Sequence, residues 1–94
     1  MDKKLDPLLH NELRLSIMSI LVSVESAEFG YLLEKTAASK GNLSVQLTKL
    51  KDAKYILVTK SFKKNMPLTT CNISKKGEQA FKDYVNQISK YLKL

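Results

Sequence analysis

The first quarter of the chain carries apolar residues at helical spacing. One stripe consists of Leu9, Leu13, Ile17, Ile20, Leu21 and Val24. A second stripe consists of Leu15, Met18 and Val22. Together the two stripes make the predicted helix apolar over most of its circumference, which is more than a surface helix needs. We therefore expect this helix to be central in the fold or to be covered by a second subunit.

Two positions are suitable for the start of this helix. Asp6 can accept a hydrogen bond from a free backbone amide, and Pro7 fits the first helical position because it has no amide to leave unpaired. Asn11 is also a suitable cap, and it would leave a short turn before a helix that begins near Glu12. The pattern leaves both alternatives open.

Two short helices are predicted next, joined by a turn of a few residues. The apolar run after Phe29 indicates a helix over about 30–37. The second helix has one inward stripe, formed by Leu43, Leu47 and Leu50. Ser39 is placed to cap its N-terminus. Two short helices joined in this way are typical of a helix-turn-helix unit, here at about 30–53.

From Tyr55 onward the pattern changes to that of a β-hairpin. Residues Tyr55 to Phe62 favour a strand, and the Thr-rich segment 68–73 favours a returning strand. The tip between them is predicted at residues 63–67, Lys-Lys-Asn-Met-Pro. The hairpin as a whole would occupy about 55–73 and would present a basic tip.

A last helix is predicted over about 75–93, with Ser74 as its N-cap. Its apolar stripe is formed by Phe81, Val85, Ile88 and Leu92, flanked by Tyr84 and Tyr91. This stripe can pack on the domain's own core or pair with its mate across a two-fold axis. We favour pairing, because the first helix also has apolar surface to spare. The expected fold is mainly α with a small β-hairpin, in one domain spanning 1–94.

Composition narrows the class of protein. The chain has 94 residues, 44% of them hydrophobic, which is enough for one modest core. A single cysteine, Cys71, allows no intramolecular disulfide, so we expect a reducing compartment, by default the cytoplasm, and a buried structural thiol. The longest apolar stretch, Ile17–Val24, is too short to span a bilayer, and no signal-type segment follows Lys3 and Lys4. No membrane partner is expected.

Charge is distributed unevenly along the chain. The formal net charge is +7, but residues 1–39 are slightly acidic and residues 40–76 contain nine lysines and one aspartate. The second short helix and the hairpin therefore hold most of the positive charge. A cluster of this kind is attracted to duplex phosphates and displaces their counterions. This asymmetry favours a nucleic-acid partner over lysines that merely keep the surface solvated.

Catalysis and cofactor binding are disfavoured. The chain has no Gly-rich phosphate loop, no Ser/His/Asp grouping and no recognisable pair of catalytic carboxylates. His10 is the only histidine, and a metal site would need partners that the sequence does not supply. We predict a protein that is not an enzyme and that uses no metal or cofactor.

Several short segments resemble the small single-domain winged helix-turn-helix regulators of the MarR and ArsR kind. The segments are Leu5–Asn11, Arg14–Ile17, Gly41–Ser44, Leu47–Leu50, Ala53–Ile56, Pro67–Thr70 and Ile73–Gly77. Their order and spacing cover nearly the whole chain. The resemblance implies a three-helix core with a wing and a C-terminal dimerisation helix. It also implies a transcriptional regulator that binds double-stranded DNA as a homodimer, with the N-terminal and C-terminal helices forming the dimer contact.

The resemblance also implies which residues meet DNA. The recognition-helix positions are Ser39, Lys40, Asn42, Ser44, Val45, Gln46 and Lys49. The wing positions are Lys63, Lys64 and Asn65. The helix is expected to enter the major groove, where the amides of Asn42 and Gln46 suit adenine, while the wing touches phosphates or the minor groove. Helical geometry turns Val45 and Thr48 outward when the leucine stripe faces inward.

Two positions depart from the family pattern. Lys54 stands at the end of the recognition helix where the family usually has Gly, so a left-handed backbone there would cost more. Val45 replaces a residue that is often polar or basic; it can contact a thymine methyl but cannot hydrogen-bond a base. Modest base specificity is the expected consequence.

Two other functions remain as alternatives. A winged helix can also serve as a protein-interaction module that never touches DNA, and its binding would be insensitive to salt. RNA binding ranks lower, because RNA readers usually expose aromatic side chains for stacking and the aromatic residues here look largely structural.

Overall fold

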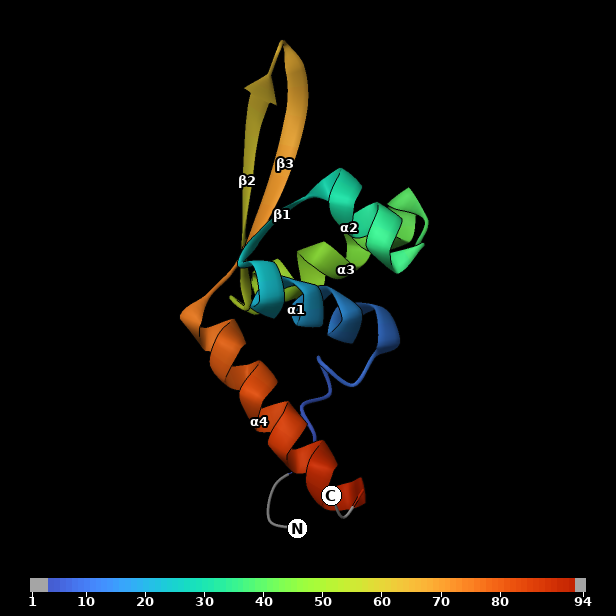
Figure 1. The fold of residues 1–94 in the computed structure, drawn as a ribbon, viewed down its shortest axis with the longest axis vertical. Coiled ribbons are helices and arrows are strands. Elements are labelled where there is room, and N and C mark those ends of the chain that lie inside the picture. The colour runs from blue at the N-terminus through green and yellow to red at the C-terminus, as the bar shows by residue number, and fades with distance from the viewer. Residues whose placement is uncertain (1–3, 93–94) are drawn as a thin grey trace.

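The computed structural model describes residues 4–92, and in that range four helices gather at the base of a three-stranded antiparallel sheet, whose β2–β3 hairpin projects away from them (Figure 1). The elements are α1 (Glu12–Val24), β1 (Ser26–Glu28), α2 (Phe29–Thr36), α3 (Lys40–Asp52), β2 (Ile56–Lys63), β3 (Met66–Ile73) and α4 (Lys75–Leu92). The predicted fold class, mainly helical with a small hairpin, is confirmed. The end predicted for the last helix, near residue 93, lies outside the described residues.

The start of α1 settles the alternative that the sequence left open. The Asn11 side chain accepts a hydrogen bond from the Arg14 amide at 2.9 Å and caps the helix. Asp6 starts a separate turn, in which its carboxylate accepts from the Leu8 amide at 2.9 Å and its carbonyl from the His10 amide at 3.0 Å. A short turn therefore precedes a helix that begins at Glu12.

The core is built around α1, which lies between α4 and the α2–α3 pair (Figure 1). Its residues Ile17, Met18 and Leu21 are fully buried. Residues from the turn before α1, the other three helices and the sheet complete the core: Leu9, Ala27, Leu32, Leu43, Leu47, Leu50, Ile56, Cys71 and Tyr84. The prediction that the first helix is central is confirmed.

The sheet has the strand order β1-β3-β2, and its first strand was not predicted. β1 has only three residues, and it pairs with β3 so that Ala27 lies opposite Cys71. Ala27 is the one buried residue of the three. A strand this short has no detectable alternation of its own, and it exists because β3 offers it a free edge. The chain reaches it through Glu25, whose left-handed φ of 67° ends α1.

The junction of β2 and α4 is tightly packed. Ser74 caps α4, as predicted, by accepting a hydrogen bond from the Gly77 amide at 2.9 Å. The Ser74 hydroxyl also donates to the carbonyls of Lys54 and Tyr55. A Cβ at Gly77 would lie 2.1 Å from the Tyr55 carbonyl oxygen, so only glycine fits. Two of the family-like segments, 53–56 and 73–77, thus meet in space.

The buried face of α4 differs from the predicted stripe. Tyr84, expected to flank the stripe, is 5% exposed and its hydroxyl hydrogen-bonds His10 Nδ1 at 2.9 Å. Val85 and Leu92, expected within the stripe, are 41% and 61% exposed. The reason is that the segment before α1 covers the helix on the Tyr84 side. One edge of α4 is therefore left apolar and open.

Cys71 lies in β3 with no exposed surface, so the predicted buried thiol is confirmed. Burial raises its pKa to about 11, because the thiolate would lose its hydration. The pKa of Tyr55 is likewise raised to about 12, chiefly by burial and also because its hydroxyl donates to the Asp6 carboxylate. Neither group is poised for chemistry near neutral pH.

Candidate nucleic-acid interface

The third helix presents the face that the leucine spacing predicted. Leu43, Leu47 and Leu50 are buried, while Val45 is 51% exposed and Thr48 is exposed beside it. Ser39 caps the helix by accepting a hydrogen bond from the Asn42 amide at 3.1 Å. Its outer surface carries a shallow hollow lined by Ser44, Val45, Thr48 and Lys49. Three predicted contact residues, Ser44, Val45 and Lys49, thus line one open face of α3.

Gln46 is held differently from the other predicted contact residues. The Arg14 guanidinium on α1 donates a hydrogen bond to Gln46 Oε1. Gln46 Nε2 in turn donates to Asn42 Oδ1 at 3.0 Å. Gln46 is half-buried, and both ends of its side-chain amide take part in a bridge between α1 and α3. Asn42 keeps its amide hydrogens free on an exposed side chain, but its oxygen is already engaged.

The bridge also fixes Arg14 itself. Its Nε donates to the Leu8 carbonyl at 2.6 Å, and its Nη1 reaches Gln46. Because two nitrogens of the planar guanidinium are held at once, its orientation is fixed, and it positions Gln46 and, through Gln46, Asn42. Sequence reasoning did not single out Arg14 for this role. No signal in the pattern pairs it with a residue 32 positions later.

The hairpin has two distinct faces, because side chains alternate along paired strands. Ile56 and Cys71 are buried toward the core, so Val58, Lys60 and Phe62 on β2 share the core side of the sheet. Their partners across the ladder, Cys71, Thr69 and Pro67, lie on that same face. The other face carries Leu57, Thr59, Ser61 and Lys63 on β2 and Asn72, Thr70, Leu68 and Met66 on β3.

The tip of the hairpin is tighter than predicted. Strand pairing continues to Lys63 and Met66, so Lys64 and Asn65 alone form the turn, and the predicted tip of 63–67 is too wide. Both turn residues have positive φ, 51° and 64°, as a two-residue type I′ hairpin requires. Asn adopts this conformation readily. The two turn residues and Lys63 are exposed at the end of the molecule most distant from α4 (Figure 1).

A cleft of about 150 Å³ lies between α3 and the core-side face of the hairpin. It is lined by Phe29, Ser44, Leu47, Thr48, Lys51, Val58, Lys60 and Thr69. The predicted contact residues form two groups, one on α3 and one at the hairpin tip. The cleft lies on the surface between these two groups. Lys51, Lys60 and Thr69 were not among the predicted site residues, although strand alternation places the latter two on this face.

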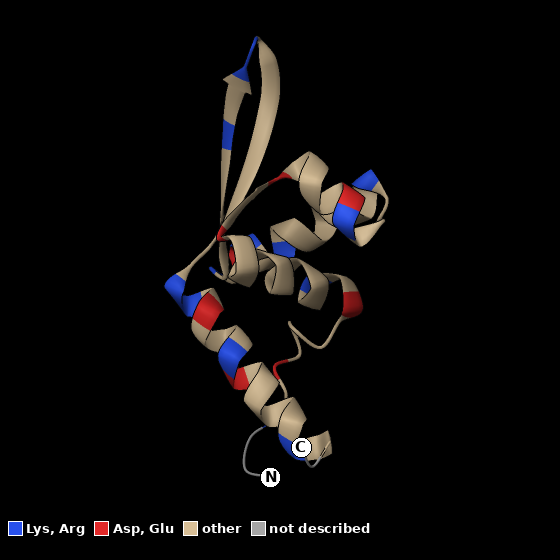
Figure 2. Cartoon of the chain, in the orientation of Figure 1, with Lys and Arg blue, Asp and Glu red and all other residues tan. Residues whose placement is uncertain are grey.

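Positive charge follows the same surface. Figure 2 shows basic positions along β2 and at the hairpin tip. Every lysine from 40 to 64 is exposed: Lys40, Lys49, Lys51, Lys54, Lys60, Lys63 and Lys64. Eight residues of strand span roughly 25 Å, so the hairpin can carry charge from the helices to phosphates well beyond them. The arrangement suits a long polyanion rather than a single small anion.

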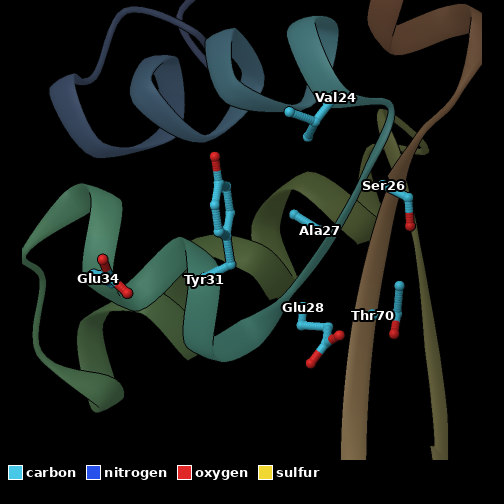
Figure 3. A pocket seen from close by; sticks show the side chains of 7 residues that line it. All are labelled: Val24, Ser26, Ala27, Glu28, Tyr31, Glu34 and Thr70. Carbon is cyan, nitrogen blue, oxygen red and sulfur yellow. The ribbon is translucent and has the colours of Figure 1, made fainter.

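A second and larger hollow, of about 640 Å³, has the opposite character (Figure 3). It lies among the end of α1, β1, α2 and β3, and Glu28 and Glu34 are among its lining residues. Figure 3 shows the Tyr31 hydroxyl pointing toward α1 and Glu28 beside Thr70 of β3. Two carboxylates would repel phosphate, so this hollow does not belong to the nucleic-acid surface.

The described residues hold neither a candidate metal site nor a helix that could span a membrane. Among residues 4–92, no three His, Cys, Asp or Glu side chains are grouped closely enough to hold a metal ion. Within that same range, no helix is both long enough and apolar enough to cross a bilayer.

The chain belongs to the family described as winged helix DNA-binding domain, whose pattern matches residues 13–92. It is 37% identical to the uncharacterized protein MJ0432 of Methanocaldococcus jannaschii over 75 aligned residues. The alignment covers 80% of this chain and 82% of that protein. It is therefore a DNA-binding regulator, and winged-helix regulators of this kind are not enzymes. The resemblance to small winged-helix regulators is confirmed.

Solved structures show the same fold. A transcriptional regulator homologue from Pyrococcus horikoshii OT3 superposes with a TM-score of 0.78 at 26% identity, over 93% of this chain and 89% of that one. A putative transcriptional regulator from Thermoplasma acidophilum superposes with a TM-score of 0.68 at 21% identity, over 93% and 90% of the two chains. The second likeness shows the fold alone.

Proposed function

We propose that this protein binds duplex DNA sequence-specifically as a homodimer, with α3 in the major groove and the hairpin, here called the wing, on flanking phosphates or in the minor groove. The observation that carries the proposal is the exposed lysine surface that joins α3 to the wing. Residues 40–73, which span α3 and the wing, hold seven of the sixteen Lys and Arg of the chain.

Base recognition falls to few residues in this proposal. Asn42 offers amide hydrogens to an acceptor on a base edge, such as the guanine O6 or N7. A bidentate contact of Asn42 with adenine would use its oxygen as well, which already accepts one hydrogen bond from Gln46. Val45 is placed for the thymine methyl, and Ser44 and Lys49 for base edges or phosphates. Ser39 and Lys40 lie at the helix N-terminus, which favours a phosphate.

The wing supplies position and affinity rather than sequence. Lys63, Lys64 and Asn65 are exposed at the tip, and lysine contacts with phosphates release counterions. Each such contact steepens the dependence of affinity on salt by about one unit in the logarithmic slope.

Dimerisation is proposed through the open edge of α4 and the end of α1. Val85, Tyr91 and Leu92 are exposed on α4, and Val22 and Val24 are exposed on α1. Figure 1 shows that the C-terminal half of α4 extends beyond α1–α3. A two-fold pairing would bury these side chains and would set the separation of the two α3 helices, and therefore of two DNA half-sites.

The DNA proposal is tested by fluorescence anisotropy of a labelled mixed-sequence duplex across a salt series. Wild type is compared with the double variant Lys63→Ala/Lys64→Ala and with a control, Lys82→Ala/Lys90→Ala, which removes equal charge from α4. We expect the wing variant to lower the salt slope by about 2 and the control to leave it unchanged. Absence of wild-type binding at low salt would refute the proposal and favour a protein-interaction module.

The dimer is tested separately by sedimentation equilibrium. We expect a dimeric mass for wild type and a monomeric mass for Val85→Glu, because a charge on the open edge of α4 would be desolvated in the pair. Lys90→Glu, on the side of α4 away from that edge, serves as the control. A monomeric wild type would contradict this half of the proposal.

A further inference from the structure

The wing carries an exposed aromatic side chain that the core does not explain. Phe62 is 76% exposed, more than any other large apolar residue in the range 4–92. It lies opposite Pro67 in the β2–β3 ladder, so the two form an apolar pair one position before the residues that flank the turn. An exposed phenyl ring this far from the core adds nothing to folding stability. Its apolar surface is available to a partner.

The face on which Phe62 lies is the one that continues toward α3. Strand alternation places Phe62 with Lys60 and Val58, and both of these line the cleft against α3. From the core outward this face reads Ile56, Val58, Lys60 and Phe62 on β2. Phe62 is therefore at the outer end of the same surface that begins at the predicted recognition helix.

The charge around Phe62 indicates which partner covers it. Lys60 lies two residues before it on the same face, and Lys63 and Lys64 follow it directly. All three are exposed. A protein partner that covered Phe62 would also have to supply carboxylates for the lysines beside it. A DNA minor groove has phosphates along both rims and deoxyribose walls that an apolar side chain can contact. Charge complementarity therefore favours a groove.

We propose that Phe62, backed by Pro67, is an apolar wedge that enters the minor groove of the duplex while the wing lysines hold the phosphates on either side. The inference rests on the proposed DNA-binding function. An apolar side chain inserted at a base step partly unstacks it and bends the duplex toward the major groove. The wedge would then favour flexible pyrimidine–purine steps, which cost least to open, and so add sequence preference without a base hydrogen bond.

The test compares Phe62→Ala with Leu57→Ala, a matched control on the opposite face of the same strand that is 61% exposed. Anisotropy across a salt series measures affinity, and energy transfer between dyes at the two ends of the duplex measures bending. We expect Phe62→Ala to weaken binding about tenfold, since a buried phenyl ring is lost, with an unchanged salt slope. The bend should decrease in the same variant, while Leu57→Ala should match wild type in both.

A second variant, Phe62→Leu, keeps an apolar side chain and should retain part of the bend. The outcomes separate the two proposals. If the wild-type protein fails to bind the duplex, both the proposed function and the proposed wedge are refuted. If wild type binds and Phe62→Ala binds and bends DNA equally well, only the wedge is refuted. A change of oligomeric mass in Phe62→Ala would also refute it, because Phe62 would then be a subunit contact.

Discussion

Gly77 at the start of α4 lies against the backbone carbonyl of Tyr55, so closely that a Cβ on Gly77 would come within 2.1 Å of the oxygen. The obstructing atom is backbone, and it cannot swing aside as a side chain would. The same carbonyl accepts hydrogen bonds from the Ser74 amide and hydroxyl. The contact therefore fixes the angle at which α4 leaves the sheet.

We expect Gly77→Ala to destabilise the protein by about 2–3 kcal/mol, because relief of the clash requires the helix to move. Gly41→Ala is the matched control: it is also in the first turn of a helix, and a Cβ there meets nothing within 4 Å. That control should leave stability unchanged or raise it by up to about 1 kcal/mol. Urea unfolding followed by circular dichroism measures both. Equal stabilities would contradict the close contact.

The bridge from Arg14 to Gln46 yields a second prediction. Arg14→Ala and Gln46→Ala should each lower stability, and a double-mutant cycle should give a coupling of about 1 kcal/mol, since the donor is charged but the pair is only half-buried. Gln46→Ala should also change the base preferred opposite Asn42, because it frees the Asn42 oxygen. A selection from randomised duplexes measures that preference. Zero coupling would mean that the bridge does not form in solution.

The local sequence pattern was sufficient to predict the helices and strands that are stabilised by contacts between residues close together in the chain. The stripe of Leu43, Leu47 and Leu50 with its Ser39 cap predicted α3 and its outer face, because both signals lie within the helix itself. The wing was predicted from a run of β-forming residues on each side of a polar turn. Its exact tip was not, since only the strand register shows that pairing continues to Lys63 and Met66.

Features that depend on distant residues could not be predicted. β1 is three residues long and forms only because β3 lies beside it. The buried face of α4 was placed wrongly because Tyr84 is covered by a segment near His10, 74 positions earlier. The hydrogen bond that Arg14 of α1 donates to Gln46 of α3 was not predicted either. In each case the deciding contact joins segments that share no sequence periodicity.

The buried thiol of Cys71 provides a third prediction. With no exposed surface and a pKa of about 11, Cys71 should resist a thiol reagent in the native protein at pH 8 and react fully in urea. Absorbance of the released chromophore measures the rate. Rapid reaction without denaturant would contradict the burial. The ordinary pKa of this thiol is 9.0, so the folded state holds its proton more tightly than the unfolded state does.

The same shift predicts an alkaline loss of stability. Because the folded pKa is raised, the contribution of Cys71 is fully present below pH 9 and is lost as the pH rises from about 9 to about 11. Cys71→Ala should remove this part of the pH dependence, although it will lower stability at every pH by leaving a small cavity. Urea unfolding of both proteins between pH 8 and pH 11 measures the difference. Parallel curves would contradict the shift.

The end of α3 is strained at Lys54, whose φ is 68°. The strain is tolerated because the turn satisfies the last carbonyls: the Lys54 amide donates to Lys51 at 2.9 Å and the Tyr55 amide to Leu50 at 3.0 Å. This is the arrangement in which glycine is usual. Lys54→Gly should therefore raise stability by about 1 kcal/mol, since glycine adopts this backbone without a steric cost.

Lys54→Ala separates the strain from the charge, because alanine removes the lysine but keeps the unfavourable backbone. Thermal unfolding should show a gain for glycine alone. In the DNA titration both variants should behave alike, because both lack the lysine charge. If Lys54 contacts a phosphate, each variant should have a salt slope lower than that of wild type by about 1; if it does not, both slopes should equal that of wild type. Equal stabilities of the two variants would show that the left-handed turn costs nothing. If the loss of Lys54 also weakens DNA binding, the lysine increases affinity for DNA at the cost of stability.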